Sequence, residues 1–299
     1  MKCADPKRLI ILFLCCISFL STAVIASEKE YKESETIMLW PKDAASQDKK
    51  AMGTPKPDRG DGHIRLTDIT QPSMRYFPAS VKKGHGPVPA IIICPGGGYS
   101  LLVVTKITPI AKWLNEQGIS VFMLLYHVPK NRNKAFQDIQ RAVRIVRSRA
   151  SEWNLDPKRI GVMGSSAGGH LAARVSTGFG IKAYEEVDKL DAVSSKPDFT
   201  VLLYPAYMNK GKELTKDFKV SNELSPTLII TAKDDKLSYP GNLIYAKALK
   251  EAGASIRTHF FEKGGHGFSL RPKQHPLSTW PDLFLQWLKD MKIIAEKAE

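Results

Sequence analysis

The sequence predicts an α/β fold, with a mostly parallel central sheet, helices on both of its faces and an N-terminal antiparallel strand pair. From Ala90 onward, short continuous apolar runs alternate with amphipathic stretches of helical period, a pattern typical of a parallel sheet covered on both faces. Before Ala90, two runs alternate between polar and apolar residues, Ile64 to Ile69 and Ser73 to Phe77. Only Thr70, Gln71 and Pro72 separate these runs, so we expect the two runs to pair at the edge of a sheet.

The apolar and amphipathic runs give the elements in order. Six runs predict strands, over Ala90 to Cys94, Ile119 to Tyr126, Arg159 to Met163, Phe199 to Tyr204, Thr227 to Ala232 and Ser255 to Phe261. Four predict helices, over Pro109 to Gln117, Lys134 to Trp153, Gly241 to Ala252 and Asp282 to Ala295. The polar stretch from Glu213 to Ser225 fits either a cap or rim loop over the strand ends or a plain surface loop.

The N-terminus has a different composition from the rest of the chain. Three basic residues precede an apolar run from Leu9 to Leu20, and small residues precede Ser27, which is the pattern of a secretory signal peptide cleaved near Ala26. A retained membrane anchor is the alternative, but residues 9–26 are barely long enough to span a bilayer. We therefore expect a secreted or periplasmic protein with no stable membrane partner after cleavage. Residues 27–62 are predicted to be an extended lead-in, and residues 63–299 one folded domain.

Charge and cysteine usage exclude several classes of protein. The formal net charge is +14, and removing residues 1–26 leaves about +12. No basic cluster alternates with aromatic residues, and four arginines fit the solvated side of a helix, so we expect no nucleic-acid partner (Arg141, Arg144, Arg147, Arg149). Cys94 is the one cysteine beyond residue 26, which excludes a disulfide within the mature chain. We expect no metal and no cofactor, and the oligomeric state is not predictable.

The segment around Ser166 carries the strongest functional signal. Residues 161–170, GVMGSSAGGH, contain one Gly-x-Ser-x-Gly match, between an apolar run and a helix-compatible run. A strand, a sharp turn and a helix are the context that a nucleophile elbow requires. Such a strained turn leaves no room for side chains two residues before and after the nucleophile, where Gly164 and Gly168 lie. The same positions around Ser165 carry side chains, so Ser166 is the predicted nucleophile; a glycine-rich turn without chemistry is the alternative.

A serine hydroxyl is a poor nucleophile at neutral pH, so Ser166 needs a base and a group that orients the base. His266 follows the last predicted strand in the sequence EKGGHGF, where glycines let the loop return toward the elbow. Asp234 and Asp235 end the preceding strand, and either could orient the base while the other caps a turn. His170 lies within the helix after the elbow, where we expect a structural hydrogen bond.

A tetrahedral intermediate also needs hydrogen-bond donors for its oxyanion. The sequence PGGGY follows the strand that ends at Cys94, so the backbone N–H groups of Gly97 and Gly98 are candidate donors. The N–H of Ala167, the residue after the nucleophile, is the third. A phosphate-binding turn is the alternative, but neither a G-x-G-x-x-G spacing nor a P-loop lysine follows.

With these residues in place, the sequence resembles the secreted, acetyl xylan esterase-like carbohydrate esterases of the α/β-hydrolases. The likeness runs from about residue 39 to the C-terminus and is carried by seven motifs: LWP at 39–41, ICPGGGY at 93–99, DIQRAV at 138–143, GVMGSSAGGHL at 161–171, PDF at 197–199, YP at 204–205 and GGHGF at 264–268. It implies an α/β-hydrolase catalytic domain over 63–299, with Ser166 as nucleophile, His266 as base and amides near Gly97 and Gly98 as oxyanion donors. Similar proteins place the acid just before the turn that opens the next helix, which favours Asp235.

Two positions depart from the pattern of the resembling proteins. Those proteins usually carry Arg after the tyrosine, where this chain has His127, and a Val-Pro pair shortly after the acid, where this chain has LSYP at 237–240. The resemblance implies a serine esterase that removes short acyl groups, above all acetyl, from polysaccharides or oligosaccharides such as xylan. The alternatives are a serine peptidase or general short-chain carboxylesterase of the same fold, and a non-catalytic binding protein with a relic elbow.

Overall fold

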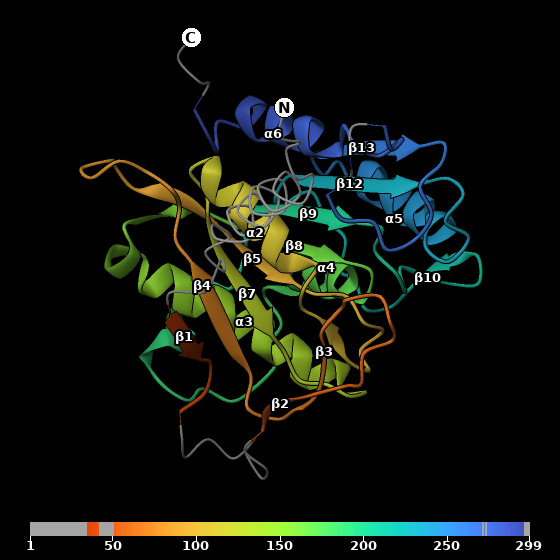
Figure 1. The fold of residues 1–299 in the computed structure, drawn as a ribbon. Helices are drawn as coiled ribbons and strands as arrows, with labels where there is room; N and C mark the ends of the chain where they lie inside the picture. Colours follow the sequence, from red (N-terminus) through yellow and green to blue (C-terminus); the bar gives the residue numbers. More distant parts are fainter. Residues whose placement is uncertain (1–34, 42–50, 271, 273, 296–299) are drawn as a thin grey trace, which may run out of the picture. The chain divides into compact units, whose positions relative to one another are not determined.

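An eight-stranded sheet forms the centre of the protein, in the spatial order β1-β4-β7-β5-β8-β9-β12-β13 (Figure 1). Adjacent strands from β7 to β13 along this order run parallel to one another, whereas β4 runs antiparallel to both β1 and β7. All six predicted parallel strands are present. The strands span Glu35–Met38 (β1), Ser73–Phe77 (β4), Val88–Cys94 (β5), Ser120–Leu125 (β7), Leu155–Ser165 (β8), Phe199–Leu203 (β9), Thr227–Ala232 (β12) and Ile256–Phe261 (β13).

The computed structural model describes residues 35–41, 51–270, 272 and 274–295. The predicted signal peptide, residues 1–26, lies outside these residues, as do parts of the predicted lead-in. Two strands come from the rest of the lead-in, β1 and β2 (Met52–Pro55), and each joins a sheet. Within the described residues, no helix is both long and apolar enough to cross a membrane.

Among the described residues, five α-helices cover the two faces of the sheet: α2 (Ile107–Glu116), α3 (Arg132–Ser148), α4 (Ala167–Gly178), α5 (Tyr239–Glu251) and α6 (Trp280–Asp290). Right-handed crossovers place α3, α4 and α5 on one face and α2, which connects strands in the opposite direction along the sheet, on the other. The ring of Trp113 on α2 contacts Trp280 on α6 at 5.8 Å between centroids, so α2 and α6 share a face (Figure 1). The predicted helix 134–153 is divided in the structure. α3 ends at Ser148, and a separate 3₁₀ turn over Ala150–Trp153 follows and ends at Asn154 in a left-handed conformation.

The two strands predicted before residue 90 exist but do not pair with each other, so the predicted pairing is wrong. β3 (Arg65–Ile69) lies in a separate antiparallel sheet between β2 and β6 (Leu102–Val103), whereas β4 lies in the main sheet between β1 and β7. Both edges of β4 are therefore occupied by strands distant in sequence. Alternation identifies a strand but not its partner, because the pattern reports which face is buried and says nothing of the neighbour.

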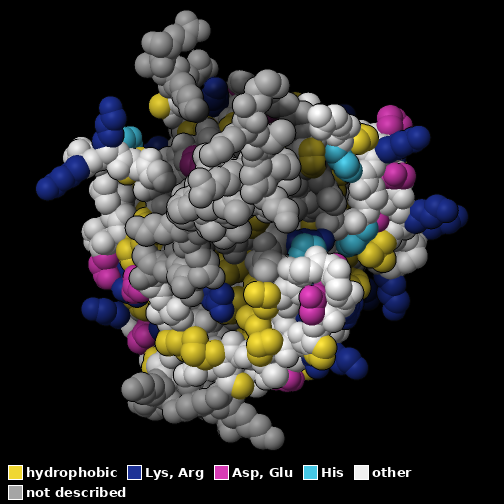
Figure 2. Space-filling view, in the orientation of Figure 1, with side chains coloured by type: hydrophobic (Ala, Val, Ile, Leu, Met, Phe, Trp, Pro, Cys, Tyr) yellow, Lys and Arg dark blue, Asp and Glu magenta, His cyan; other side chains and the backbone are white. Residues whose placement is uncertain are grey.

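Three of the four arginines predicted on a solvated side, Arg141, Arg144 and Arg147, instead lie against another segment of the chain. Arg141 is buried, and its guanidinium donates to the backbone oxygen of Leu39 at 3.0 Å and to Asp188 at 2.8 Å. Arg144 and Arg147 donate to backbone oxygens of Val193 and Ser194. The segment 188–198 covers this side of the helix, and the arginines satisfy its carbonyl groups. Elsewhere, on the face seen in Figure 2, Lys and Arg side chains are dispersed rather than gathered in one stripe.

Candidate active site

Ser166 lies at the junction of β8 and α4, in a backbone conformation of φ 53° and ψ −119° that a side-chain-bearing residue rarely adopts. The neighbouring chain segments pass so closely that glycine is required on both sides. A Cβ atom on Gly164 would lie 2.1 Å from the Gly168 oxygen, and one on Gly168 would lie 2.0 Å from the Cys94 oxygen. The steric argument made from the sequence is confirmed, and the strained turn leaves Ser166 half-buried at the end of the strand.

The structure brings Ser166, His266 and Asp235 into one hydrogen-bonded chain. His266 Nε2 is 2.8 Å from Ser166 Oγ, and His266 Nδ1 is 2.7 Å from Asp235 Oδ2. Asp235 is 2% exposed and also accepts from the N–H groups of Leu237 at 3.1 Å and Ser238 at 3.2 Å, and from the Ser238 hydroxyl. An ionised carboxylate only accepts hydrogen bonds, so Nδ1 carries the ring proton and Nε2 is left to accept from the serine. The sequence LSYP at 237–240, where the resembling proteins have a Val-Pro pair, thus supplies Ser238 as a hydrogen-bond donor to Asp235.

Asp234 holds the loop that carries the histidine rather than the histidine itself. Its carboxylate accepts from the N–H of Gly265 at 2.9 Å and of Gly264 at 3.2 Å, and these donors hold the pKa of Asp234 below its usual range. On the other side of His266, Lys106 Nζ donates to the Gly267 oxygen at 2.8 Å. Consecutive acids therefore have separate tasks. Lys106 was missed from the sequence, because nothing local marks a lysine at the start of α2 as the partner of a loop 161 residues later.

The predicted oxyanion donors lie on both sides of Ser166. The loop after β5 runs against the elbow so closely that a Cβ on Gly96 would lie 2.9 Å from the Ser165 oxygen and 3.2 Å from Ser166 Cβ. Gly97 and Gly98 have φ values of 142° and 67°, in the region that favours glycine. Ala167 is the first residue of α4, and an N–H in the first turn of a helix has no acceptor within the helix.

His170 is buried on α4 and connects Tyr99 with Asp217. Its Nδ1 is 2.8 Å from the Tyr99 hydroxyl, and its Nε2 is 3.1 Å from Asp217 Oδ2. Burial lowers the pKa of His170, and the hydrogen bond from His170 lowers the pKa of Asp217, so a neutral ring meets an ionised carboxylate. Burial also raises the pKa of Tyr99, which stays protonated and donates to Nδ1. The polar stretch 213–225 is thus anchored on the elbow helix through Asp217, a partner that no sequence signal indicated.

His127, the other departure from the resembling proteins, is a buried partner of Asp138. Asp138 Oδ2 accepts from the backbone N–H of His127 at 2.8 Å and lies 2.7 Å from His127 Nδ1, while Oδ1 accepts from Trp40 Nε1 at 2.9 Å. The motifs LWP and DIQRAV are therefore joined by a buried carboxylate. This cluster ties the residues that follow β1 and β7 to α3.

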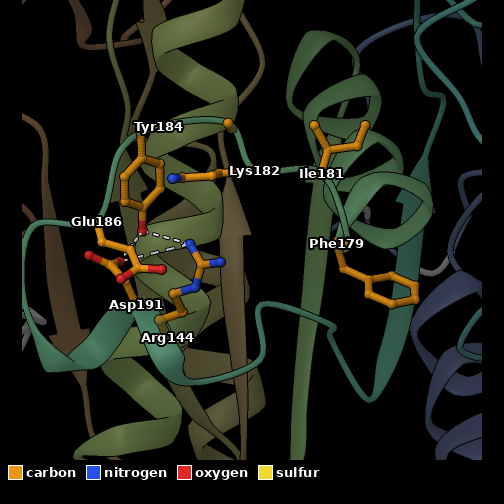
Figure 3. A pocket seen from close by; sticks show the side chains of 9 residues that line it. Arg144, Phe179, Ile181, Lys182, Tyr184, Glu186 and Asp191 are labelled. Atoms are coloured by element: carbon orange, nitrogen blue, oxygen red, sulfur yellow. Dashed lines mark hydrogen bonds and ion pairs between the residues drawn. The ribbon is translucent and has the colours of Figure 1, made fainter.

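Two of the cavities outside the Ser166 chain border α3. One of about 220 Å³ is lined by residues of α3 and of the segment after α4, and its polar groups bond to each other: Arg144 donates to the Tyr184 hydroxyl at 2.6 Å, and that hydroxyl donates to Asp191 at 2.5 Å (Figure 3). The other, of about 460 Å³, lies beside Gly98. Among the described residues, no group of three or more His, Cys, Asp or Glu side chains could hold a metal ion.

The chain is similar to several known proteins. The BD-FAE family model matches residues 76–203. The chain is 33% identical over 256 residues to an acetylxylan esterase of Xylanibacter ruminicola, covering 76% of this chain and 48% of the relative. It is 25% identical over 291 residues to endo-1,4-beta-xylanase B of Butyrivibrio fibrisolvens, covering 83% of this chain and 44% of that relative. The structure of an acetyl ester-xyloside bifunctional hydrolase from Caldicellulosiruptor lactoaceticus is similar with a TM-score of 0.70 and 28% identity, covering 89% of this chain and 100% of that one.

The fold and the elbow are those of an α/β-hydrolase, and the chain is similar to proteins described as esterases. Within that fold, the chain is similar to an acetylxylan esterase and to an acetyl ester-xyloside hydrolase, and the BD-FAE model matches part of it. The chain spans about half the length of the curated relatives that it matches.

Proposed function

We propose that this protein is a serine esterase that removes acetyl groups from xylan or a related polysaccharide through an acyl-enzyme. The observation that carries the proposal is the chain from Asp235 through His266 to Ser166, with both links between 2.7 and 2.8 Å. These are hydrogen-bond distances already suited to proton transfer. Similarity to an acetylxylan esterase and to an acetyl ester-xyloside hydrolase supports the acyl group and the sugar.

In the proposed mechanism, Ser166 Oγ attacks the ester carbonyl while His266 Nε2 accepts its proton. Asp235 holds Nδ1–H and stabilises the imidazolium that forms. The N–H groups of Ala167 and of Gly97 or Gly98 donate to the oxyanion. The protonated Nε2 then gives its proton to the leaving sugar hydroxyl, and a water activated by His266 hydrolyses the acyl-enzyme, which releases acetate.

The short acyl group in this proposal is supported by the similarity to an acetylxylan esterase and to an acetyl ester-xyloside hydrolase. Each methylene beyond acetyl would have to find new apolar surface, worth about 0.8 kcal/mol, or displace packed side chains. We expect kcat/KM on aryl esters to fall from acetate to butyrate and to be barely measurable for octanoate. Efficient turnover of octanoate would contradict the short-acyl assignment.

Labelling and substitution test the mechanism. A fluorophosphonate probe should label the wild type and the Ser165→Ala variant, but not Ser166→Ala, and turnover of aryl acetate should follow the same pattern. Release of acetate from acetylated xylan then tests the substrate. Labelling of Ser166→Ala would move the nucleophile elsewhere. Activity on peptides without release of acetate from any acetylated glycan would favour the peptidase alternative, and no labelling at all would favour a binding protein.

We propose in addition that residues 1–26 direct export and are removed. The proposal is supported by the basic residues followed by an apolar run and small residues before Ser27. Expression in a bacterial host, followed by fractionation and N-terminal sequencing, should yield a periplasmic or secreted chain that begins near Ser27. A cell-retained chain with an intact Met1 would contradict it.

A further inference from the structure

The 460 Å³ cavity lies directly beside the proposed oxyanion loop. Gly98, Tyr99 and Ser100 form one side of it, and residues 130–133, which lead into α3, form the other. Gly98 is one of the N–H donors proposed for the oxyanion, so a group in this cavity lies next to the reacting ester. The acyl group needs only a small space, so the larger cavity suits the alcohol part of the substrate, which is the sugar chain.

The cavity is positively charged. Lys130 and Arg132 both line it, and none of its lining residues is acidic. Within the described part of the chain, neither cation forms an ion pair. Arg132 helps to lower the pKa of Asp217, but the carboxylate of Asp217 is already hydrogen-bonded to His170. Among the described residues, Lys130 and Arg132 therefore have no ion-pair partner, and their positive charge favours an anionic ligand.

Arg132 is held in a defined position, which a specific subsite requires. Its guanidinium lies over the ring of Tyr207 at 4.2 Å from the centroid and over that of Tyr99 at 5.1 Å. Tyr207 is 38% exposed, and its hydroxyl would lie 3.6 Å from a Cβ on Gly98. A guanidinium stacked on aromatic rings keeps its N–H groups directed outward, where they can bind a carboxylate in bidentate geometry.

We propose that this cavity is a subsite for the sugar chain of the substrate and that Lys130 and Arg132 bind a carboxylate on that chain, as carried by a uronic acid substituent. This inference rests on the proposed function for its placement of the ester. It makes the protein an esterase selective for acidic acetylated saccharides over neutral ones.

The test compares two acetylated oligosaccharides with the same backbone, one neutral and one carrying a single uronic acid. The wild type should show a kcat/KM about tenfold higher on the acidic substrate at low ionic strength, and the ratio should approach one in about 0.5 M salt, where exposed charges are screened. Arg132→Met and Lys130→Met should each reduce the ratio about threefold, because each cation is partly exposed. The ratio, unlike either rate, is insensitive to general loss of activity.

Lys182→Met is the matched control. Lys182 lines the other cavity, its side chain is 61% exposed, and it pairs with Glu185, so it should leave the ratio unchanged. Equal kcat/KM on the two substrates in the wild type, or a ratio that survives both the Arg132 and the Lys130 substitutions, would overturn the subsite.

A binding measurement separates this inference from the proposed function. Calorimetry on the Ser166→Ala protein with unacetylated oligosaccharides needs no turnover. The uronate-bearing one should bind about tenfold more tightly than the neutral one, and the difference should disappear in Ser166→Ala/Arg132→Met/Lys130→Met. If the wild type hydrolyses no acetyl ester, the proposed function fails while calorimetry still decides the subsite. If acetate is released but the two saccharides bind equally, the subsite alone fails.

Discussion

Replacing each of the two consecutive acids by asparagine tests the assignment of their roles. In Asp235→Asn the side chain keeps its shape but loses its charge. If the amide nitrogen faces His266, Nδ1 must accept, Nε2 carries the proton, and the ring cannot take the proton of Ser166. If the amide oxygen faces it, the imidazolium lacks its counter-charge. Either way kcat should fall on the order of 10⁴-fold, which is about 5.5 kcal/mol in the barrier.

Asp234→Asn should cost far less. Asp234 touches the backbone N–H groups of Gly264 and Gly265, and an asparagine oxygen can still accept from one of them. We expect kcat on aryl acetate to stay within about tenfold of the wild type. Because Asp235 is buried and accepts several hydrogen bonds, its asparagine variant should also lose about 1–2 kcal/mol of unfolding free energy.

The assay is kcat and KM on aryl acetate for both variants, with thermal unfolding to show that each is folded. A folded Asp235→Asn protein with kcat within tenfold of wild type would remove Asp235 from its orienting role. The same conclusion would follow if Asp234→Asn were the more damaging change.

The remaining predictions concern the elbow and the buried histidine. Gly96→Ala should reduce kcat at least about 100-fold, because its Cβ would press on the Ser165 oxygen and Ser166 Cβ, whereas Gly180→Ala, whose Cβ meets no atom within 4 Å, should match the wild type. An active Gly96→Ala enzyme would show that the loop does not fix the elbow. Burial holds the pKa of His170 in the folded protein below its ordinary 6.5, so the unfolded chain takes up the proton first as the pH falls. The free energy of unfolding is therefore unaffected by His170 above about pH 6.5 and decreases as the pH falls below that value. The midpoint of thermal unfolding should therefore decline from pH 6.5 to 5 less steeply in His170→Gln than in the wild type; equal slopes would show that His170 stays neutral in both states or charges in both.

The site could be predicted from the sequence because its residues follow strands. Ser166, Asp235 and His266 each come just after a strand of a parallel sheet, and the carboxyl ends of parallel strands meet at one edge. The glycines around Ser166 add a local steric signal that needs no knowledge of the rest of the chain. The glycine positions around Ser166 and the positions of the residues after parallel strands are together enough to predict that three residues up to 100 positions apart lie in one site.

What could not be predicted depends on which segments cover which surfaces. The pattern of α3 shows a polar side, but only the position of segment 188–198 decides that Arg141 on that side is buried. The pairing of β3 and β4 with other strands is a choice of the same kind. Lys106 bonds to Gly267, 161 positions away, and Asp217 bonds to His170, 47 positions away. Gly267 and Asp217 lie in irregular loops, whose sequences show no hydrophobic periodicity from which a contact could be predicted.

The loop at 264–267 is fastened at both of its ends, by Asp234 before the histidine and by Lys106 after it, while Asp235 holds the ring. A base held in this way is ordered before any substrate arrives, so catalysis begins without a closing movement. Crystals of the free protein should therefore tolerate soaking with a phosphonate inhibitor without cracking. The free and inhibited coordinates of His266 should superimpose, and solvent viscosity should slow turnover only through diffusion of substrate and product.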